Sequence, residues 1–336
     1  MVSLTTSHDQ NHLLEIQELQ TFFFIFEGVI RAVDDVSFFV DKGEVLGIVG
    51  ESGCGKSVTA QSIMRIIPEP PGRIVGGKMM FDGLNLVELS MSQMRSVRGN
   101  RISMIFQEPM TSLNPVFTVG GQISEMFRRH RKLSKGDSWV QSVEMLKNVQ
   151  IPAPDKRAHE YPHQLSGGMR QRAMIAMALS CDPEILIADE PTTALDVTVQ
   201  AQILDLMMQL KEDYETAVVI ITHDLGVIAE IAKRVVVMYA GKVVEEAPTL
   251  SIFEDPKHPY TRGLLKSIPK LGGRSRGGDR RLPEIAGIVP SLLDLPGGCY
   301  FSPRCAEATS ICHEKPPELI DTGGSHRVRC WLYSGC

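Results

Sequence analysis

A glycine-rich segment near residue 50 has the composition of a phosphate-binding loop. Residues 50–57 read G-E-S-G-C-G-K-S and separate a predicted strand, Val45–Val49, from a helix predicted to begin near Lys56. Glycines let backbone N–H groups converge on phosphate oxygens, and a helix start adds partial positive charge. We expect Lys56 to neutralise the β- and γ-phosphates of ATP and the Ser57 hydroxyl to coordinate Mg²⁺. The contacts predicted in this phosphate loop come from Gly50, Ser52, Gly53, Cys54, Gly55, Lys56, Ser57 and Val58.

Two carboxylates end another apolar run. The segment I-L-I-A-D-E spans Ile185–Glu190, and carboxylates at the end of a buried strand require a partner. We expect Asp189 to bind Mg²⁺ and Glu190 to polarise the attacking water as a general base, a role worth about 100 to 10,000-fold in rate. An ordinary acidic pair at a strand end is the alternative, and the phosphate loop upstream favours the catalytic interpretation.

These residues must be positioned by an α/β domain, predicted over residues 13–250. Apolar β-branched runs alternate there with amphipathic segments, which indicates a largely parallel sheet whose carboxyl ends collect ligand groups. Residues 119–181 are mainly helical in pattern and are expected to form an inserted helical subdomain. Residues 251–336 form a small cysteine-containing C-terminal extension. The principal strands are predicted at Val45–Val49, Ile102–Phe106, Ile185–Ala188 and Val218–Ile221.

Composition narrows the class of protein. The 336 residues are 43% hydrophobic and 22% charged, which is typical of folded globular chains. A net charge of −5 gives no reason to expect a nucleic-acid partner. The apolar runs are shorter than the ~18 to 20 residues that cross a membrane, and the first residues lack the pattern of a secretory signal. We expect a cytoplasmic chain that reaches a membrane only through partner subunits.

A second segment narrows the family. Residues 165–171 read L-S-G-G-M-R-Q, and here the chain resembles the ABC ATPase family. Ser166, Gly167 and Gly168 open an apolar helix, where N–H groups and a hydroxyl form a second anion site. The resemblance implies that two such domains dimerise head to tail, each closing its signature segment over the γ-phosphate in its partner's loop. Met169 stands where the generic signature has Gln, a form that resembles the peptide-importer branch.

The same resemblance assigns three further residues to the site. Gln107, in M-I-F-Q-E-P, matches the loop that senses Mg²⁺ and the γ-phosphate and touches the membrane partner. Asp196, in T-A-L-D, matches the segment that crosses the dimer interface. His223, in I-T-H-D, matches the switch histidine that contacts the γ-phosphate, so we expect it to act beside Glu190 in catalysis.

Adenine is expected to stack on an aromatic residue upstream of the phosphate loop. The run T-F-F-F-I-F offers several, of which Phe23 aligns best. Phe22 and Phe24 compete with it, and core packing is the alternative role for all three.

The extension resembles that of the oligopeptide and dipeptide importers. The resemblance rests on H-P-Y-T-R-G-L-L-K-S-I-P at residues 258–269 and on G-G-C-Y-F-S-P-R-C around Cys299. It implies a peripheral ATPase subunit on the cytoplasmic face of the inner membrane, paired with a second ABC ATPase chain, two membrane-spanning permeases and an extracytoplasmic solute-binding protein. Peptides are the expected cargo, with nickel chelates or glutathione as alternatives. A soluble ABC ATPase of DNA maintenance or translation is the alternative of another class, which the lack of long coiled coils and tandem ATPase domains disfavours.

Five of the seven cysteines follow residue 298. A cytoplasmic location argues against stable disulfides. Some relatives hold a four-iron, four-sulfur cluster at matching positions, so the resemblance implies such a cluster here, with zinc or no metal as alternatives. The ligands expected for it are Cys299, Cys305, Cys312 and Cys330.

Overall fold

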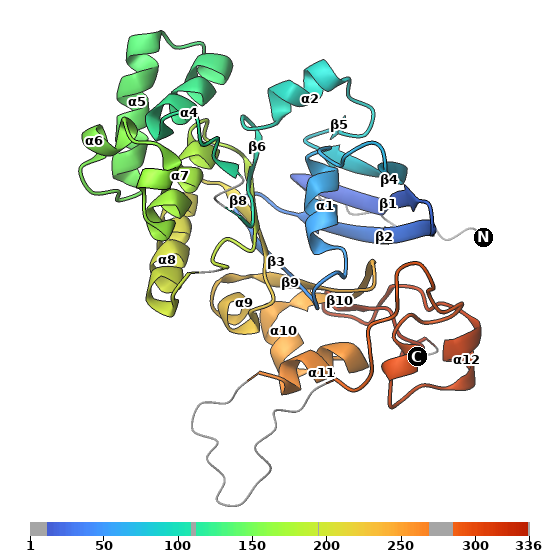
Figure 1. Cartoon of the computed structure of the whole chain (residues 1–336). Helices are drawn as coiled ribbons and strands as arrows, with labels where there is room; N and C mark the ends of the chain where they lie inside the picture. Colours follow the sequence, from blue (N-terminus) through green and yellow to red (C-terminus); the bar gives the residue numbers. More distant parts are fainter. Residues whose placement is uncertain (1–11, 109–111, 194, 269–284, 335–336) are drawn as a thin grey trace, which may run out of the picture.

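The computed structural model describes residues 12–108, 112–193, 195–268 and 285–334 and contains two β-sheets (Figure 1). The larger sheet has the strand order β11-β12-β10-β9-β3-β8-β7-β6, and its five parallel strands are buried at every residue. Strands buried on both faces read as continuous apolar runs, which is why the sequence located them so closely. The parallel strands are β3 (Val45–Val49), β6 (Ile102–Ile105), β7 (Ile185–Asp189), β8 (Ala217–Ile221) and β9 (Arg234–Tyr239).

The smaller sheet is antiparallel, with the order β2-β1-β4-β5. It packs on the larger sheet through a shared apolar core, and helix α1 (Lys56–Ile63) lies beside it (Figure 1). A hydrogen bond of 2.8 Å between Thr21 Oγ1 and Ser62 Oγ joins β1 to α1. The phosphate loop is therefore attached to both sheets. The strands are β1 (Leu14–Ile25), β2 (Gly28–Val40), β4 (Gly72–Phe81) and β5 (Leu84–Asn85).

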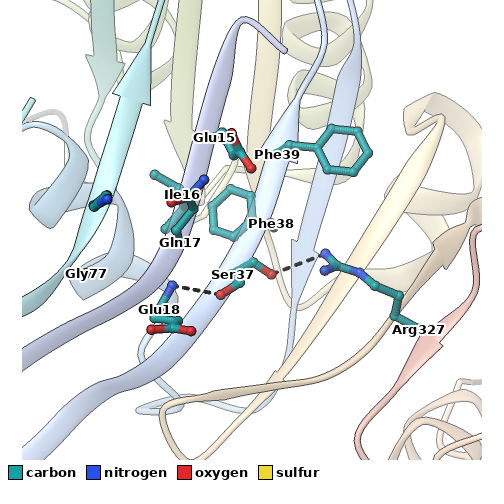
Figure 2. Close-up of a pocket in the computed structure, with 10 residues that line it drawn as sticks. Glu15, Ile16, Gln17, Glu18, Ser37, Phe38, Phe39, Gly77 and Arg327 are labelled. Carbon is teal, nitrogen blue, oxygen red and sulfur yellow. Dashed lines mark hydrogen bonds between the residues drawn. The ribbon is translucent and has the colours of Figure 1, made fainter. Parts of the chain in front are cut away.

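Bulges in β1 open a hollow of about 510 Å³ on this sheet (Figure 2). Glu18 adopts a φ of 49° there, and its N–H donates to Ser37 Oγ at 2.8 Å. Arg327 of the extension donates from Nη2 to the Ser37 carbonyl at 3.3 Å. The extension therefore contacts the smaller sheet at this hollow. The hollow is separate from the carboxyl ends of β3, β7 and β8.

Residues 119–181 are mainly helical and stand together on one side of the molecule (Figure 1). Their elements are α4 (Val119–Met126), the π-helix η1 (Phe127–Arg131), α5 (Lys135–Asn148), α6 (Pro154–Ala158), the 3₁₀-helix η2 (Pro162–Gln164) and α7 (Gly167–Leu179). Other helices in the described ranges are α2 (Met91–Val97), α8 (Val197–Asp213), α9 (Leu225–Ile231) and α10 (Thr249–Glu254), the last of which runs into the extension. Within the described ranges, the helices are all too short or too polar to cross a membrane.

The extension completes the far edge of the large sheet. Strand β12 pairs with β10, placing Glu245 opposite Val328, and β11 pairs with β12. The buried Glu245 carboxylate accepts the backbone N–H groups of Lys257 and His258 at 2.6 and 3.0 Å and lies 2.7 Å from His326 Nε2. These bonds hold the chain after β10 against the sheet. The elements involved are β10 (Lys242–Pro248), α11 (Pro259–Lys266), η3 (Ser302–Arg304), α12 (Ser310–Glu314), β11 (Ile320–Asp321) and β12 (Arg327–Val328).

The prediction of an iron–sulfur cluster in the extension is wrong. Across the described residues, which include Cys299, Cys305, Cys312 and Cys330, no three His, Cys, Asp or Glu side chains form a group that can hold a metal ion. Cys299 and Cys305 instead pack against the apolar core. Burial raises the pKa of both thiols, and it raises the pKa of Cys330 to about 11. Cys299, Cys305 and Cys330 are therefore small residues packed in or against the core.

The thiol state of Cys330 is testable by alkylation. The folded pKa of about 11, against an ordinary value of 9.0, leaves roughly a hundredfold less thiolate at pH 8. We expect Cys330 to react with iodoacetamide at least that much more slowly in the folded protein than in guanidinium, as followed by peptide mass spectrometry. Equal rates in the two states would contradict this account.

A buried arginine joins the two sheets and the extension. Arg234, at the start of β9, donates from Nε to Glu44 Oε1 at 3.0 Å and forms an ion pair with Glu246. Its guanidinium carbon lies 3.6 Å from the centre of the Phe39 ring. Arg327 of the extension also pairs with Glu246, so both acidic residues depend on cations for their burial.

We expect Arg234→Met to lower the free energy of unfolding by about 3 to 5 kcal/mol, because it leaves Glu44 without its buried partner. The measurement is urea unfolding followed by circular dichroism. Lys147→Met is the matched control, since its ion pair with Glu144 is exposed (67% and 53% for the two side chains). A loss no larger than that of the control would contradict the assignment.

Candidate nucleotide site

The phosphate loop is held open by glycines at its two ends. Gly50 has a φ of 152°, and a Cβ there would lie 2.2 Å from the Met238 carbonyl oxygen. At Gly55, with a φ of 102°, a Cβ would lie 2.3 Å from the Ala32 carbonyl oxygen. Residues with side chains are therefore excluded where the loop leaves β3 and where it enters α1.

The predicted lysine lies inside the loop. Lys56 is buried, and its ammonium donates to the carbonyl oxygens of Gly50 at 2.8 Å and Glu51 at 3.0 Å. These partners are neutral, so they orient the ammonium without compensating its charge. Helix α1 begins here, and Gly55 supplies no side chain to cap its first N–H groups. Together the lysine and the uncapped N–H groups form a positively charged cradle for an anion.

Ser57 and Asp189, which are both predicted to bind Mg²⁺, lie in contact although they are far apart in the sequence. The Ser57 hydroxyl donates to Asp189 Oδ1 at 3.0 Å. Burial raises the pKa of Asp189, against the lowering effect of the Ser57 hydrogen bond. A hydroxyl and a carboxylate beside a phosphate cradle are the oxygen ligands that Mg²⁺ binds, so the residues present fit Mg²⁺ with a triphosphate.

Glu190 lies next to this pair and contacts two of the predicted residues. Gln107 Nε2 donates to Glu190 Oε2 at 2.9 Å, and His223 Nδ1 lies 3.4 Å from Oε1. The backbone of Glu190 has a φ of 47°, a conformation that costs a non-glycine residue about 1 to 3 kcal/mol and that clusters at functional sites. Thr193, which the sequence analysis missed, donates its hydroxyl to Oε2 at 2.9 Å. The only indication of this contact in the sequence is that Thr193 lies three residues after Glu190.

Ser166 and Asp196 form a second, separate group. Each caps a helix, with Ser166 Oγ accepting from Met169 N at 3.4 Å and Asp196 Oδ1 accepting from Val199 N at 3.0 Å. A Cβ on Gly168 would lie 3.1 Å from Val199, so the starts of α7 and α8 pack together. Figure 1 shows the start of α7 well apart from α1. One chain therefore carries two separate groups of site residues. The first lies at the phosphate loop, and the second, which contains Ser166, Gly167 and Asp196, lies at the starts of α7 and α8.

The aromatic run lies on β1, between β2 and β4 of the small sheet. Phe23 packs against Gly72, where a Cβ would lie 2.8 Å from its ring, while Phe24 is half exposed. Arg31 stands 5.8 Å from the centre of the Phe22 ring. Phe23 is partly committed to packing, and its stacking on adenine stays a prediction.

Gln171, on α7, connects the two groups. Its buried side chain donates from Nε2 to the Pro191 carbonyl at 2.6 Å, one residue beyond Glu190. The helix that carries the signature segment is thus bonded to the strand end that carries the acidic pair. This contact was not predicted, because it joins a helix to the turn after β7 and belongs to no sequence motif.

Two family models match the chain. The model described as ABC transporter matches residues 33–193. The model described as oligopeptide/dipeptide transporter, C-terminal region, matches residues 244–312. The first match contains the phosphate loop and the acidic pair, and the second begins in β10 and ends at Cys312.

Whole-length relatives and solved structures agree with these matches. A probable peptide ABC transporter ATP-binding protein of Sinorhizobium fredii is 56% identical over 319 residues, covering 95% of this chain and 94% of the relative. The oligopeptide transport ATP-binding protein OppD of Bacillus subtilis is 50% identical over 320 residues, covering 95% and 88%. A dimeric post-hydrolysis structure of the ATP-binding cassette MJ0796 with ADP and Pi matches with a TM-score of 0.63 at 27% identity, over 70% of this chain and 98% of that one. The chain therefore belongs to the ABC transporter ATP-binding proteins, in the group that carries the oligopeptide/dipeptide C-terminal region, and has the ABC ATPase fold.

Proposed function

We propose that this chain is the ATP-hydrolysing subunit that powers import of peptides through an ABC transporter. The observation that carries the proposal is the meeting of Lys56, Ser57, Asp189 and Glu190 at one sheet edge, in a chain whose extension matches the oligopeptide/dipeptide region. Membership of the ABC ATPase family makes the chain an ATPase. The names of the relatives support peptides as the cargo, ahead of nickel chelates or glutathione.

Hydrolysis follows from the arrangement of these side chains. Lys56 and the first N–H groups of α1 bind the β- and γ-phosphates of ATP, and Ser57 and Asp189 would hold Mg²⁺, which when bound neutralises phosphate charge. Glu190 accepts a proton from water as the water oxygen bonds to the γ-phosphorus. The bond to the bridging oxygen breaks and ADP leaves with its electron pair. Gln107 and His223 orient Glu190 through their contacts with its two oxygens.

The separation of the two groups within one chain supports a head-to-tail dimer. Ser166, Gly167 and Gly168 lie at the start of helix α7, and the N–H groups of a helix start suit the γ-phosphate of a neighbouring ATPase. By its family, the chain works with membrane permeases and with a second ATPase subunit. We propose a heterodimer with a related chain, two permeases, an extracytoplasmic solute-binding protein and a peripheral place on the cytoplasmic face of the inner membrane. Residues 13–250 would be the motor and residues 251–336 the extension.

We expect Glu190→Gln to retain ATP binding and to lower kcat by at least a hundredfold, because the amide cannot accept the proton. Phosphate release by the assembled transporter measures turnover, and calorimetry measures binding. Glu144→Gln, a change to an exposed residue of α5, is the matched control and should leave both values unchanged. Wild-type turnover in Glu190→Gln would remove the general-base assignment.

The cargo assignment predicts which solute stimulates the motor. In proteoliposomes that contain the complete transporter, we expect ATP hydrolysis to rise when the solute-binding protein carries a dipeptide or oligopeptide. Glutathione and a nickel chelate should give the basal rate. Stimulation by either of them, with no response to peptides, would overturn the assignment and select the corresponding alternative.

A further inference from the structure

The extension reaches back to the phosphate loop through an ion pair. Arg304, in η3, donates from Nη1 to Glu51 Oε2 at 2.7 Å and from Nη2 to Oε1 at 3.1 Å. Glu51 is the second residue of the phosphate loop, 253 positions away in the sequence. Two parallel charge-assisted bonds fix both the distance and the orientation of the carboxylate, which a single contact would leave free to turn.

Arg304 is rigidly placed before it meets Glu51. Only 4% of its side chain is exposed, and its Nε and Nη2 also donate to the carbonyls of Ala286 and Ile285, each at 3.1 Å. The hydrogen bonds to Glu51 raise the pKa of Arg304, so its charge is constant at any physiological pH. A buried guanidinium held by these bonds fixes the position of its partner, and leaving it unpaired costs several kcal/mol.

A second residue of the extension holds the same point of the loop by its backbone. Tyr260, in α11, is fully buried, and its hydroxyl oxygen accepts the Glu51 N–H at 2.8 Å. Its ring centre lies 4.7 Å from that of Tyr239, at the end of β9, and 5.5 Å from that of Phe301, beside Arg304. The aromatic contacts tie both loop-binding residues to one packed cluster.

Glu51 in turn contacts the lysine of the nucleotide site. Its carbonyl oxygen is one of the two that accept the Lys56 ammonium. The path from the extension to the phosphate-binding charge therefore has two links: Arg304 and Tyr260 hold Glu51, and Glu51 orients Lys56.

We propose that Arg304 and Tyr260 are positioning residues of the nucleotide site, through which the extension sets the conformation of the phosphate loop and so the affinity for ATP. The inference rests on the proposed function, since it concerns the same site. The extension would then regulate ATP binding, because displacement of η3 by a partner subunit would loosen Glu51 and weaken the affinity for ATP.

The extension has other attachments, which make the effect of Arg304 separable from detachment. Strand β12 pairs with β10, Arg327 bonds to Ser37, and Arg329 forms an ion pair with Asp35 at 3.0 Å. Removing Arg304 therefore leaves the extension docked, and a change in ATP affinity reports the link to Glu51 rather than loss of the domain.

The test is ATP affinity in a double-mutant cycle, measured by calorimetry on the complete transporter in the Glu190→Gln background, where turnover is blocked. We expect Arg304→Gln and Glu51→Gln each to raise the Kd for Mg·ATP about tenfold, equivalent to about 1.4 kcal/mol. The double variant should be no weaker than either single one, because both changes break the same link. Arg304→Lys should recover part of the affinity, since it restores the charge without the two-bond fork.

Arg262→Gln is the matched control, because its ion pair with Glu307 lies within the extension and away from the loop. It should leave the Kd unchanged, and thermal unfolding should show all variants folded at the assay temperature. Unchanged affinity in Arg304→Gln and Glu51→Gln, or losses that add in the double variant, would overturn the inference alone. Failure of the Glu190→Gln parent to bind ATP would overturn the proposed function and this inference together.

Discussion

Parallel hydrogen bonding of β3, β8 and β7 brings the chemistry of this protein to one place. The register aligns Val45 with Val218 and Ile185 with Ala217, so the three strands end at a common edge. The phosphate loop follows the first strand, His223 the second and Glu190 the third. Without that register, the Ser57 hydroxyl would not meet Asp189, and no single motif would complete the site.

Charged and polar contacts attach the C-terminal extension to the rest of the chain. Carboxylates and guanidinium groups away from water require partners, and here the partners come from distant parts of the sequence. Arg304 pairs with Glu51, Arg329 pairs with Asp35, and His326 contacts Glu245. The extension is thus attached by ion pairs and hydrogen bonds as well as by its strands. The packing of the extension and the geometry of the phosphate loop therefore depend on each other.

Local motifs could be predicted from the sequence because their function depends on consecutive residues. The strand ends, the cradle around Lys56 and the acidic pair were located in this way. Arg304 could not be found, since nothing near it in sequence signals Glu51 at a distance of 253 residues. The iron–sulfur prediction failed because cysteine spacing does not determine whether thiols converge or remain protonated within the core. The prediction that Phe23 stacks on adenine stays untested, because the spacing of the aromatic run does not reveal the packing around β1.

The central claim is that ATP lies between the Lys56 loop of one subunit and the signature segment of its neighbour. The most direct measurement is a cryo-electron microscopy structure of the assembled transporter with a non-hydrolysable ATP analogue and Mg²⁺. The account predicts the triphosphate on the N–H groups of α1, and Ser166 against the γ-phosphate held by the neighbouring ATPase. A nucleotide-filled loop with Ser166 facing solvent, or a nucleotide bound away from Lys56, would contradict it.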